Sequence, residues 1–131
     1  MKKIVSFFVE GVPVAKARPR LGRHGVYTPT KTKVWERIVQ VSAIESKRVK
    51  LITTPIEARL TFYMPMPKTK AIQRKIQDGI HQKRPDLDNL IKSILDPLNN
   101  LIYKDDALVY SITAEKIYGF GKVGVDVKLW Y

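Results

Sequence analysis

Apolar residues that alternate with polar ones mark two clear strands in the first half of the chain. Residues 3–9 are rich in strand-forming types, and Gly11 and Pro13 end the run, which predicts a first strand. After Pro55 the alternation is strict, so one face of the predicted strand is buried and the other meets water. The apolar members of this second strand are Ile56, Ala58, Leu60, Phe62 and Met64.

Three further stretches have helical character. Apolar residues at spacings of four, three and three predict a helix from Thr30 or Thr32; these residues are Val34, Ile38, Val41 and Ile44. Lys47 and Arg48 lie near the end of this helix and favour its C-terminal dipole. Residues 68–78 favour a short helix closed by Gly79. From about residue 87 a stronger amphipathic pattern predicts a helix that Pro97 kinks or ends, with Asn99 and Asn100 as its exit. Its apolar residues are Leu87, Leu90, Ile91, Ile94, Leu95 and Leu98.

Two more strands, residues 108–117 and 125–131, follow on either side of a glycine-rich turn. The shortness of this turn predicts that they pair as an antiparallel hairpin. The full order is strand, helix, strand, helix, strand, strand. It predicts a single α+β domain over residues 1–131, with a mixed sheet of about four strands and two main helices.

Charge indicates the kind of partner. Twenty-four Lys and Arg against twelve Asp and Glu give a net charge of +12 and a pI near 10. The electric field of this charge favours binding of a polyanion. We prefer nucleic acid as the partner over a membrane surface, and over a charge that serves only solubility. No apolar run approaches the roughly 18 residues that span a membrane, so we expect a cytoplasmic protein. The absence of cysteine excludes disulfides and thiolate metal sites.

Residues 11–30 form a basic segment without periodicity, among prolines and glycines. It carries the cations Lys16, Arg18, Arg20 and Arg23, and a short hairpin through residues 25–27 is possible within it. The prolines and glycines favour an extended strip that presents these cations to a nucleic-acid backbone. The alternative interpretation is an ordinary solvated loop.

Five of the twelve acidic residues gather within residues 86–106. Pro85 disfavours helix at Arg84, so the helix begins at the aspartates, where Asp86 and Asp88 can turn towards one point. Asp88, Asn89 and Lys92 lie within one helical turn and can combine an acid, an amide and an ammonium. Carboxylates are the ligands that Mg²⁺ prefers. The alternative is structural, because an aspartate often caps a helix and Asp88 with Lys92 is an ordinary ion pair.

A third carboxylate, Asp106, stands before the next predicted strand, from where it could reach the same point. Asp105 is interpreted as a turn residue and Asp96 as a structural acid near the helix end. The phosphate partner implied by the net charge favours the functional interpretation of the set.

The chain resembles the RusA-type Holliday-junction resolvases of phages and prophages. The resemblance rests on the run from Asp86 to Lys92, on Asp105-Asp106 after a helix of the expected length, and on residues 11–20 followed by Tyr27-Thr28-Pro29. It departs from the family in the proline after Asp96 and in a longer basic stretch, residues 68–83.

The resemblance implies a homodimer that depends on Mg²⁺, with Mn²⁺ as an alternative, and nicks two strands symmetrically at a four-way DNA junction. By position, Asp86, Asp88 and Asp106 would bind the metal and Lys92 would be the essential basic residue. DNA contacts are expected from the basic segment, Arg84 and Asn89. Two other functions stay open: a non-catalytic nucleic-acid-binding domain, and a metal-dependent nuclease of flaps or single strands.

Overall fold

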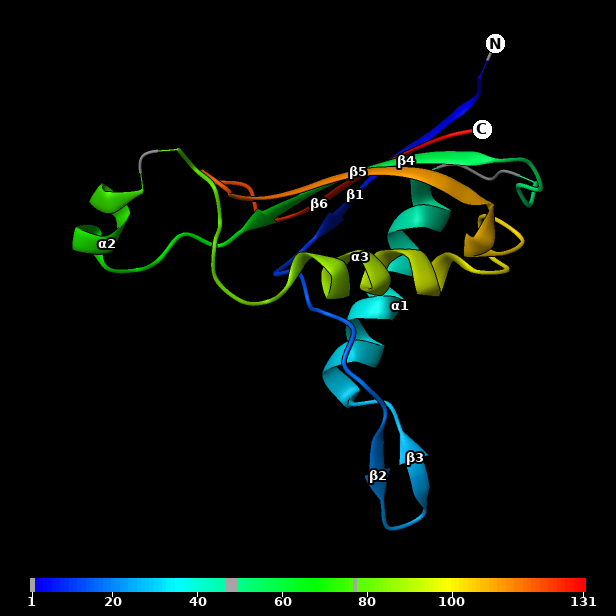
Figure 1. Ribbon diagram of the computed structural model, residues 1–131, viewed down its shortest axis with the longest axis horizontal. Helices are drawn as coiled ribbons and strands as arrows, with labels where there is room; N and C mark the ends of the chain where they lie inside the picture. Colours follow the sequence, from blue (N-terminus) through cyan, green and yellow to red (C-terminus); the bar gives the residue numbers. More distant parts are fainter. Residues whose placement is uncertain (1, 47–49, 77) are drawn as a thin grey trace.

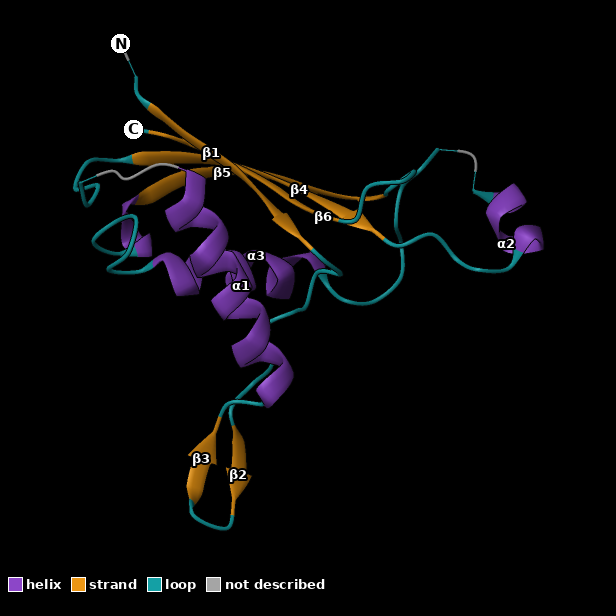
Figure 2. Cartoon of the chain, turned by 180° about the vertical axis from the view of Figure 1, so that it is seen from behind, coloured by secondary structure: helices purple, strands orange, loops and turns teal. Residues whose placement is uncertain are grey.

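Four strands form a mixed sheet in the order β1-β6-β4-β5, and two helices cover one of its faces in this computed structural model (Figures 1 and 2). The strands are β1 (Ile4–Glu10), β4 (Ile56–Met64), β5 (Val109–Tyr118) and β6 (Gly124–Trp130). β6 pairs antiparallel with both β1 and β4, whereas β4 and β5 are parallel. The predicted α+β class with a mixed four-stranded sheet is therefore confirmed. The structure describes residues 2–46, 50–76 and 78–131, so Lys47 and Arg48 lie outside it.

The core lies between the sheet and its two main helices, α1 (Thr30–Ser46) and α3 (Leu87–Leu95). The five alternating apolar residues of β4 are all buried, as predicted. α3 ends at Leu95 and continues as a short 3-10 turn, η1 (Asp96–Leu98), because Pro97 lacks the N–H that a further α-helical turn needs. The proline thus ends the helix where the sequence predicted.

The predicted hairpin between the last two strands is wrong. β4 lies between β5 and β6, and neither of these two strands pairs with the other. Two strand spacings amount to about 10 Å, which the five residues between Tyr118 and Gly124 easily span. The connection therefore passes over the end of β4, where the Gly119 N–H donates to the Met64 carbonyl at 2.8 Å.

α1 turns a different face inward from the one its apolar periodicity suggests. Its buried residues are Thr32, Trp35, Val39 and Ala43. The periodic residues Val34, Ile38, Val41 and Ile44 are instead between 38% and 55% exposed. This inward face packs against β1 and α3, and it combines the large Trp35 and Val39 with the smaller Thr32 and Ala43.

Two segments project from the body (Figures 1 and 2). One is a hairpin of β2 (Arg20–Gly22) and β3 (Gly25–Tyr27), which confirms the short hairpin in the basic segment. The other carries α2 (Lys70–Lys75), which is shorter than the predicted helix and ends several residues before Gly79. Among the described residues, no helix is long and apolar enough to cross a membrane.

Candidate active site

Asp86 and Asp88 stand at the start of α3 with exposed carboxylates. Asp86 occupies the position before the first helical residue, with φ −69° and ψ 141°, yet its side chain makes no capping hydrogen bond. Its Oδ2 lies 3.7 Å from the guanidinium of Arg84, and these side chains are 54% and 89% exposed. In the described part of the chain, Asp88 has no ion pair with Lys92. The capping and ion-pair interpretations therefore do not account for these two aspartates.

Lys116 of β5 fastens the chain just before these carboxylates. Its side chain lies on the helix-covered face of the sheet, where its ammonium donates to the Pro85 carbonyl at 2.7 Å and to the Lys83 carbonyl. The first turn of α3 is closed by a hydrogen bond from the Leu90 N–H to the Asp86 carbonyl at 3.1 Å. Asp86 is thus anchored from both sides. Sequence reasoning missed Lys116, whose place in an edge strand gives no signal of this contact.

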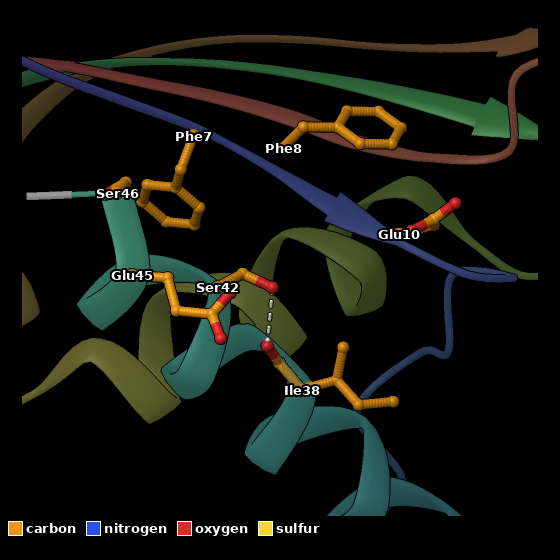
Figure 3. A pocket seen from close by; sticks show the side chains of 7 residues that line it. All are labelled: Phe7, Phe8, Glu10, Ile38, Ser42, Glu45 and Ser46. Carbon is orange, nitrogen blue, oxygen red and sulfur yellow. Dashed lines mark hydrogen bonds between the residues drawn. The ribbon is translucent and has the colours of Figure 1, made fainter.

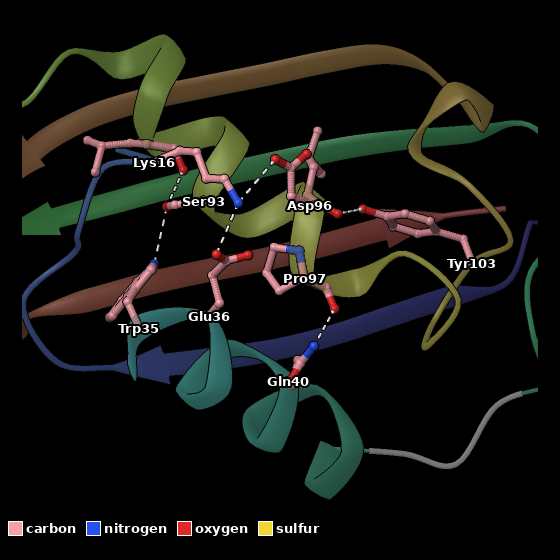
Figure 4. A network of polar contacts seen from close by, with 10 residues as sticks. Lys16, Trp35, Glu36, Gln40, Ser93, Asp96, Pro97 and Tyr103 are labelled. Atoms are coloured by element: carbon pink, nitrogen blue, oxygen red, sulfur yellow. Dashed lines mark hydrogen bonds and ion pairs between the residues drawn. The ribbon is translucent and has the colours of Figure 1, made fainter. Parts of the chain in front are cut away.

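Lys16 is engaged within the protein (Figure 4). Its backbone N–H donates to the Asn89 carbonyl at 2.9 Å. Its ammonium lies 3.0 Å from Glu36 and 3.7 Å from Asp96. The structure therefore places Lys16 as a tie between the basic segment, α1 and α3, and it places Asp96 in an ion pair, in keeping with a structural acid.

Buried polar contacts fix α1 against α3 (Figure 4). The Trp35 indole donates to Ser93 Oγ at 3.1 Å, and this hydroxyl donates in turn to the Leu90 carbonyl at 2.7 Å. Gln40 donates to the Pro97 carbonyl at 3.0 Å. Because every polar atom of this set that is buried has a partner, the position of α3 in the fold is well defined.

Asp106 lies near the opposite end of α3. It begins the turn η2 (Asp106–Leu108), and its backbone N–H donates to Asn99 Oδ1 at 2.7 Å. Burial, together with Asp105 and Asp96, raises the pKa of the Asp106 carboxyl, although Asn99 opposes the shift. The neighbours of Asp106 are therefore other acids and Asn99.

The structure does not bring Asp106 together with Asp86 and Asp88. Among the described residues, no three His, Asp or Glu side chains are arranged to hold a metal ion. The donor chemistry nevertheless suits Mg²⁺, which retains water and often takes only one or two carboxylates beside a substrate phosphate. Asp86 and Asp88 are two such carboxylates; both are exposed, and among the described residues Arg84 is the side chain that pairs with Asp86.

The remaining predicted DNA contacts lie on the basic segment and on α3. Arg18, Arg20 and Arg23 are exposed on the projecting hairpin or at its base, and Lys92 is exposed on α3. Asn89 is half-buried, with its carbonyl bound to the N–H of Lys16. Arg84, 3.7 Å from Asp86, and Lys92, one helical turn after Asp88, place positive charge near the start of α3.

Comparison with known proteins identifies the family of the chain. Residues 10–129 match the family described as endodeoxyribonuclease RusA. The chain is also 35% identical, over 124 residues, to an uncharacterized protein of Bacillus subtilis (strain 168), YqaN, with 87% of each chain covered. The matched region includes the start of α3 and the turn at Asp106.

Proposed function

The chain belongs to the RusA family of endodeoxyribonucleases, and on this premise we propose that it resolves four-way DNA junctions in recombination and repair by paired, symmetric nicks that require Mg²⁺. One observation supports the location of the chemistry. Two exposed carboxylates stand at the start of α3, without cap or lysine partner, in a protein of net charge +12. The net positive charge attracts phosphate, and these two acids supply carboxylates that can hold a cation beside it.

Asp86 and Asp88 would hold Mg²⁺, with Mn²⁺ as an alternative. When bound, the ion would supply activation of water and stabilisation of negative charge on the scissile phosphate. Lys92 follows Asp88 by one helical turn, so its exposed ammonium would stabilise the charge that develops on the phosphate. Asn89 would position a phosphate oxygen. Asp106 is proposed as the third carboxylate on the family resemblance alone.

The cations of the projecting hairpin would bind the arms of the junction. Arg18, Arg20 and Arg23 extend away from the body, and Arg84 stands beside Asp86. Phosphate contacts by these residues would release counterions from the DNA and supply affinity without sequence specificity.

Paired nicks need two active sites at a fixed separation, and the outward face of α1 offers a contact for a second copy. This face is the apolar stripe of Val34, Ile38, Val41 and Ile44, each well exposed. A hollow of about 520 Å³ lies beside Ile38, between α1 and β1, with Phe7 and Glu45 in its lining (Figure 3). An apolar stripe next to a hollow suits a self-complementary, two-fold contact.

Sedimentation tests the dimer. Ile38→Asp should convert a dimer to a monomer, because it places a charge in the centre of the contact. Ile72→Asp on α2 is a matched control, since Ile38 and Ile72 are 38% and 39% exposed, and it should stay dimeric. A dimeric Ile38→Asp protein would exclude this face, and a monomeric wild-type protein would contradict paired nicking.

Cleavage of a synthetic four-way junction, with Mg²⁺ or with chelator, tests the activity. Asp86→Asn and Asp88→Asn should bind the junction at least as well as wild type, because a negative charge near phosphate is lost, yet should not cut. Asp96→Asn should keep most activity. Binding without cutting by the wild type would support a non-catalytic domain, and single asymmetric nicks would support a flap nuclease. An inactive, folded Asp96→Asn beside an active Asp88→Asn would move the site to the other end of α3.

A further inference from the structure

A cleft of about 490 Å³ opens directly beside the candidate active site. Five parts of the chain contribute to its lining: residues 12–17, Arg20, residues 29–32 at the start of α1, Met64 with Pro65 at the end of β4, and residues 81–85. This volume falls within the range of roughly 300–1,000 Å³ typical of small-molecule sites. The cleft is therefore large enough to take a ligand of nucleotide size.

The lining combines apolar walls with a cationic border. The apolar part includes Pro13, Ala15, Ala17, Met64, Pro65 and Pro85. Arg20, Lys31 and Arg84 are the cations of the lining, and the lining contains no Asp or Glu. Such a lining suits a flat, weakly polar body attached to a negative group.

His81 adds a neutral ring to one wall. It packs against Tyr118 with 4.9 Å between ring centroids. Burial, reinforced by the positive charges of Lys116 and Lys83, lowers the pKa of this imidazole. The ring is therefore uncharged at neutral pH, so it adds another flat, neutral surface rather than a further cation.

The cleft is continuous along the chain with the catalytic carboxylates. Arg84 and Pro85 line it, and Asp86 is the next residue. The guanidinium of Arg84 lies 3.7 Å from the carboxylate of Asp86, so the cleft border and the site share this residue. A group held in the cleft would therefore lie next to the carboxylate that we propose binds the metal ion at the scissile phosphate.

We propose that this cleft receives one base of the junction strand, unstacked beside the branch point, while the adjoining phosphate lies at Asp86 and Asp88. The inference rests on the proposed function. A base at a branch point has fewer stacking and pairing contacts to lose than one inside a duplex, which makes its extrusion easier. Apolar and ring surfaces accept any base by stacking, and the bordering cations bind the phosphates on either side of it.

Fluorescence of 2-aminopurine, which rises when the base leaves the stack, tests the proposal. The probe is placed in turn at each nucleotide near the cut of a four-way junction, and Asp88→Asn protein binds without cutting. We expect a severalfold rise at one position beside the cut. Adding Ala17→Trp, which fills the cleft, should abolish the rise, whereas Ala71→Trp on exposed α2 should leave it unchanged.

Ala17→Leu serves as a milder filling variant if the tryptophan disturbs folding, and it should reduce the rise in part. In otherwise wild-type protein, filling the cleft should slow cleavage at least tenfold while affinity for the junction changes less than about threefold. A rise that survives both substitutions, or no rise at any position, would overturn the proposal. Wild-type protein that cuts junctions, with no rise in 2-aminopurine fluorescence at any position, would contradict this inference alone. Protein that neither binds nor cuts junctions would contradict the proposed function.

Discussion

Replacing Lys116 with methionine should disable cleavage without touching a metal ligand or a DNA contact. In the wild type its ammonium holds the carbonyls of Lys83 and Pro85, the latter at 2.7 Å, immediately before Asp86. Methionine is one heavy atom shorter than lysine and keeps an apolar stem, but it cannot donate a hydrogen bond. The segment would lose its tie to β5, and the orientation of Asp86 would no longer be fixed from that side.

The expected size of the effect follows from the two lost hydrogen bonds. A hydrogen bond that involves a charged group stabilises a fold by about 1.5–3 kcal/mol, and partial exposure to water reduces the value here. We therefore expect a loss of about 1–3 kcal/mol in the free energy of unfolding. A displacement of a catalytic group by about 1 Å slows reactions about a hundredfold, so cleavage should slow by roughly ten- to a hundredfold.

Single-turnover cleavage at saturating junction concentration isolates this effect from binding. Lys128→Met is the matched control, because Lys128 is an exposed lysine of β6 and its loss removes the same charge. Both variants should lose similar, small amounts of affinity, and only Lys116→Met should lose rate. If Lys116→Met cuts as fast as Lys128→Met, the tie does not position Asp86.

Lys92→Ala should fold and bind junctions but cut about a hundredfold more slowly. Lys92→Arg should stay impaired, because guanidinium is not a compact donor. A normal single-turnover rate for Lys92→Ala would leave the carboxylates as the whole catalytic set. Asp106→Asn should raise the stability measured by urea unfolding at neutral pH. Burial, and after it the neighbouring Asp105, raise the pKa of the Asp106 carboxyl, so its ionised form destabilises the fold. The gain should vanish below the ordinary carboxyl pKa of 3.8, where the carboxyl is protonated in the folded and the unfolded chain alike. A gain that persists at low pH would contradict this account. Replacing Arg18 and Arg20 with alanine should reduce the slope of log affinity against log salt by about one per lost contact, and an unchanged slope would make the segment a solvated loop.

The predictable elements are those in which the spacing of apolar residues matches the face that is buried. β4 is covered on one face only, so its alternation matches the strand period, and α3 presents one apolar side to the sheet. The order of the strands depends on contacts far apart in sequence, and no local pattern reveals that β4 separates β5 from β6. The buried face of α1 was hidden for another reason: it mixes Thr32 and Ala43 with Trp35 and Val39, whereas the exposed face repeats four branched apolar residues at helical spacing.

The candidate site was predictable only where it is local. Pro85 followed by an apolar pattern correctly indicates that the helix begins at the aspartates. The ties of this segment to Lys116 and Lys16 join residues that are distant in sequence, so composition gives no sign of them. The separation of Asp106 from Asp86 and Asp88 follows from the length of α3. Its nine residues place the two ends of the helix roughly 13 Å apart, and Asp106 lies near the far end.

The sheet order also decides when the chain can fold during synthesis. In the sheet that the described residues form, β1 pairs with β6 alone. β1 is made before the other strands of this sheet, and Ile4 pairs with Trp130. At about 5–20 residues per second, a ribosome needs roughly 6–25 s to make the intervening chain. For that interval Val5, Phe7 and Val9, which are buried in the finished protein, have no strand beside them. The nascent chain is therefore a natural client for chaperones that bind exposed apolar segments, and a cell would hold no folded nuclease until β6 had been translated.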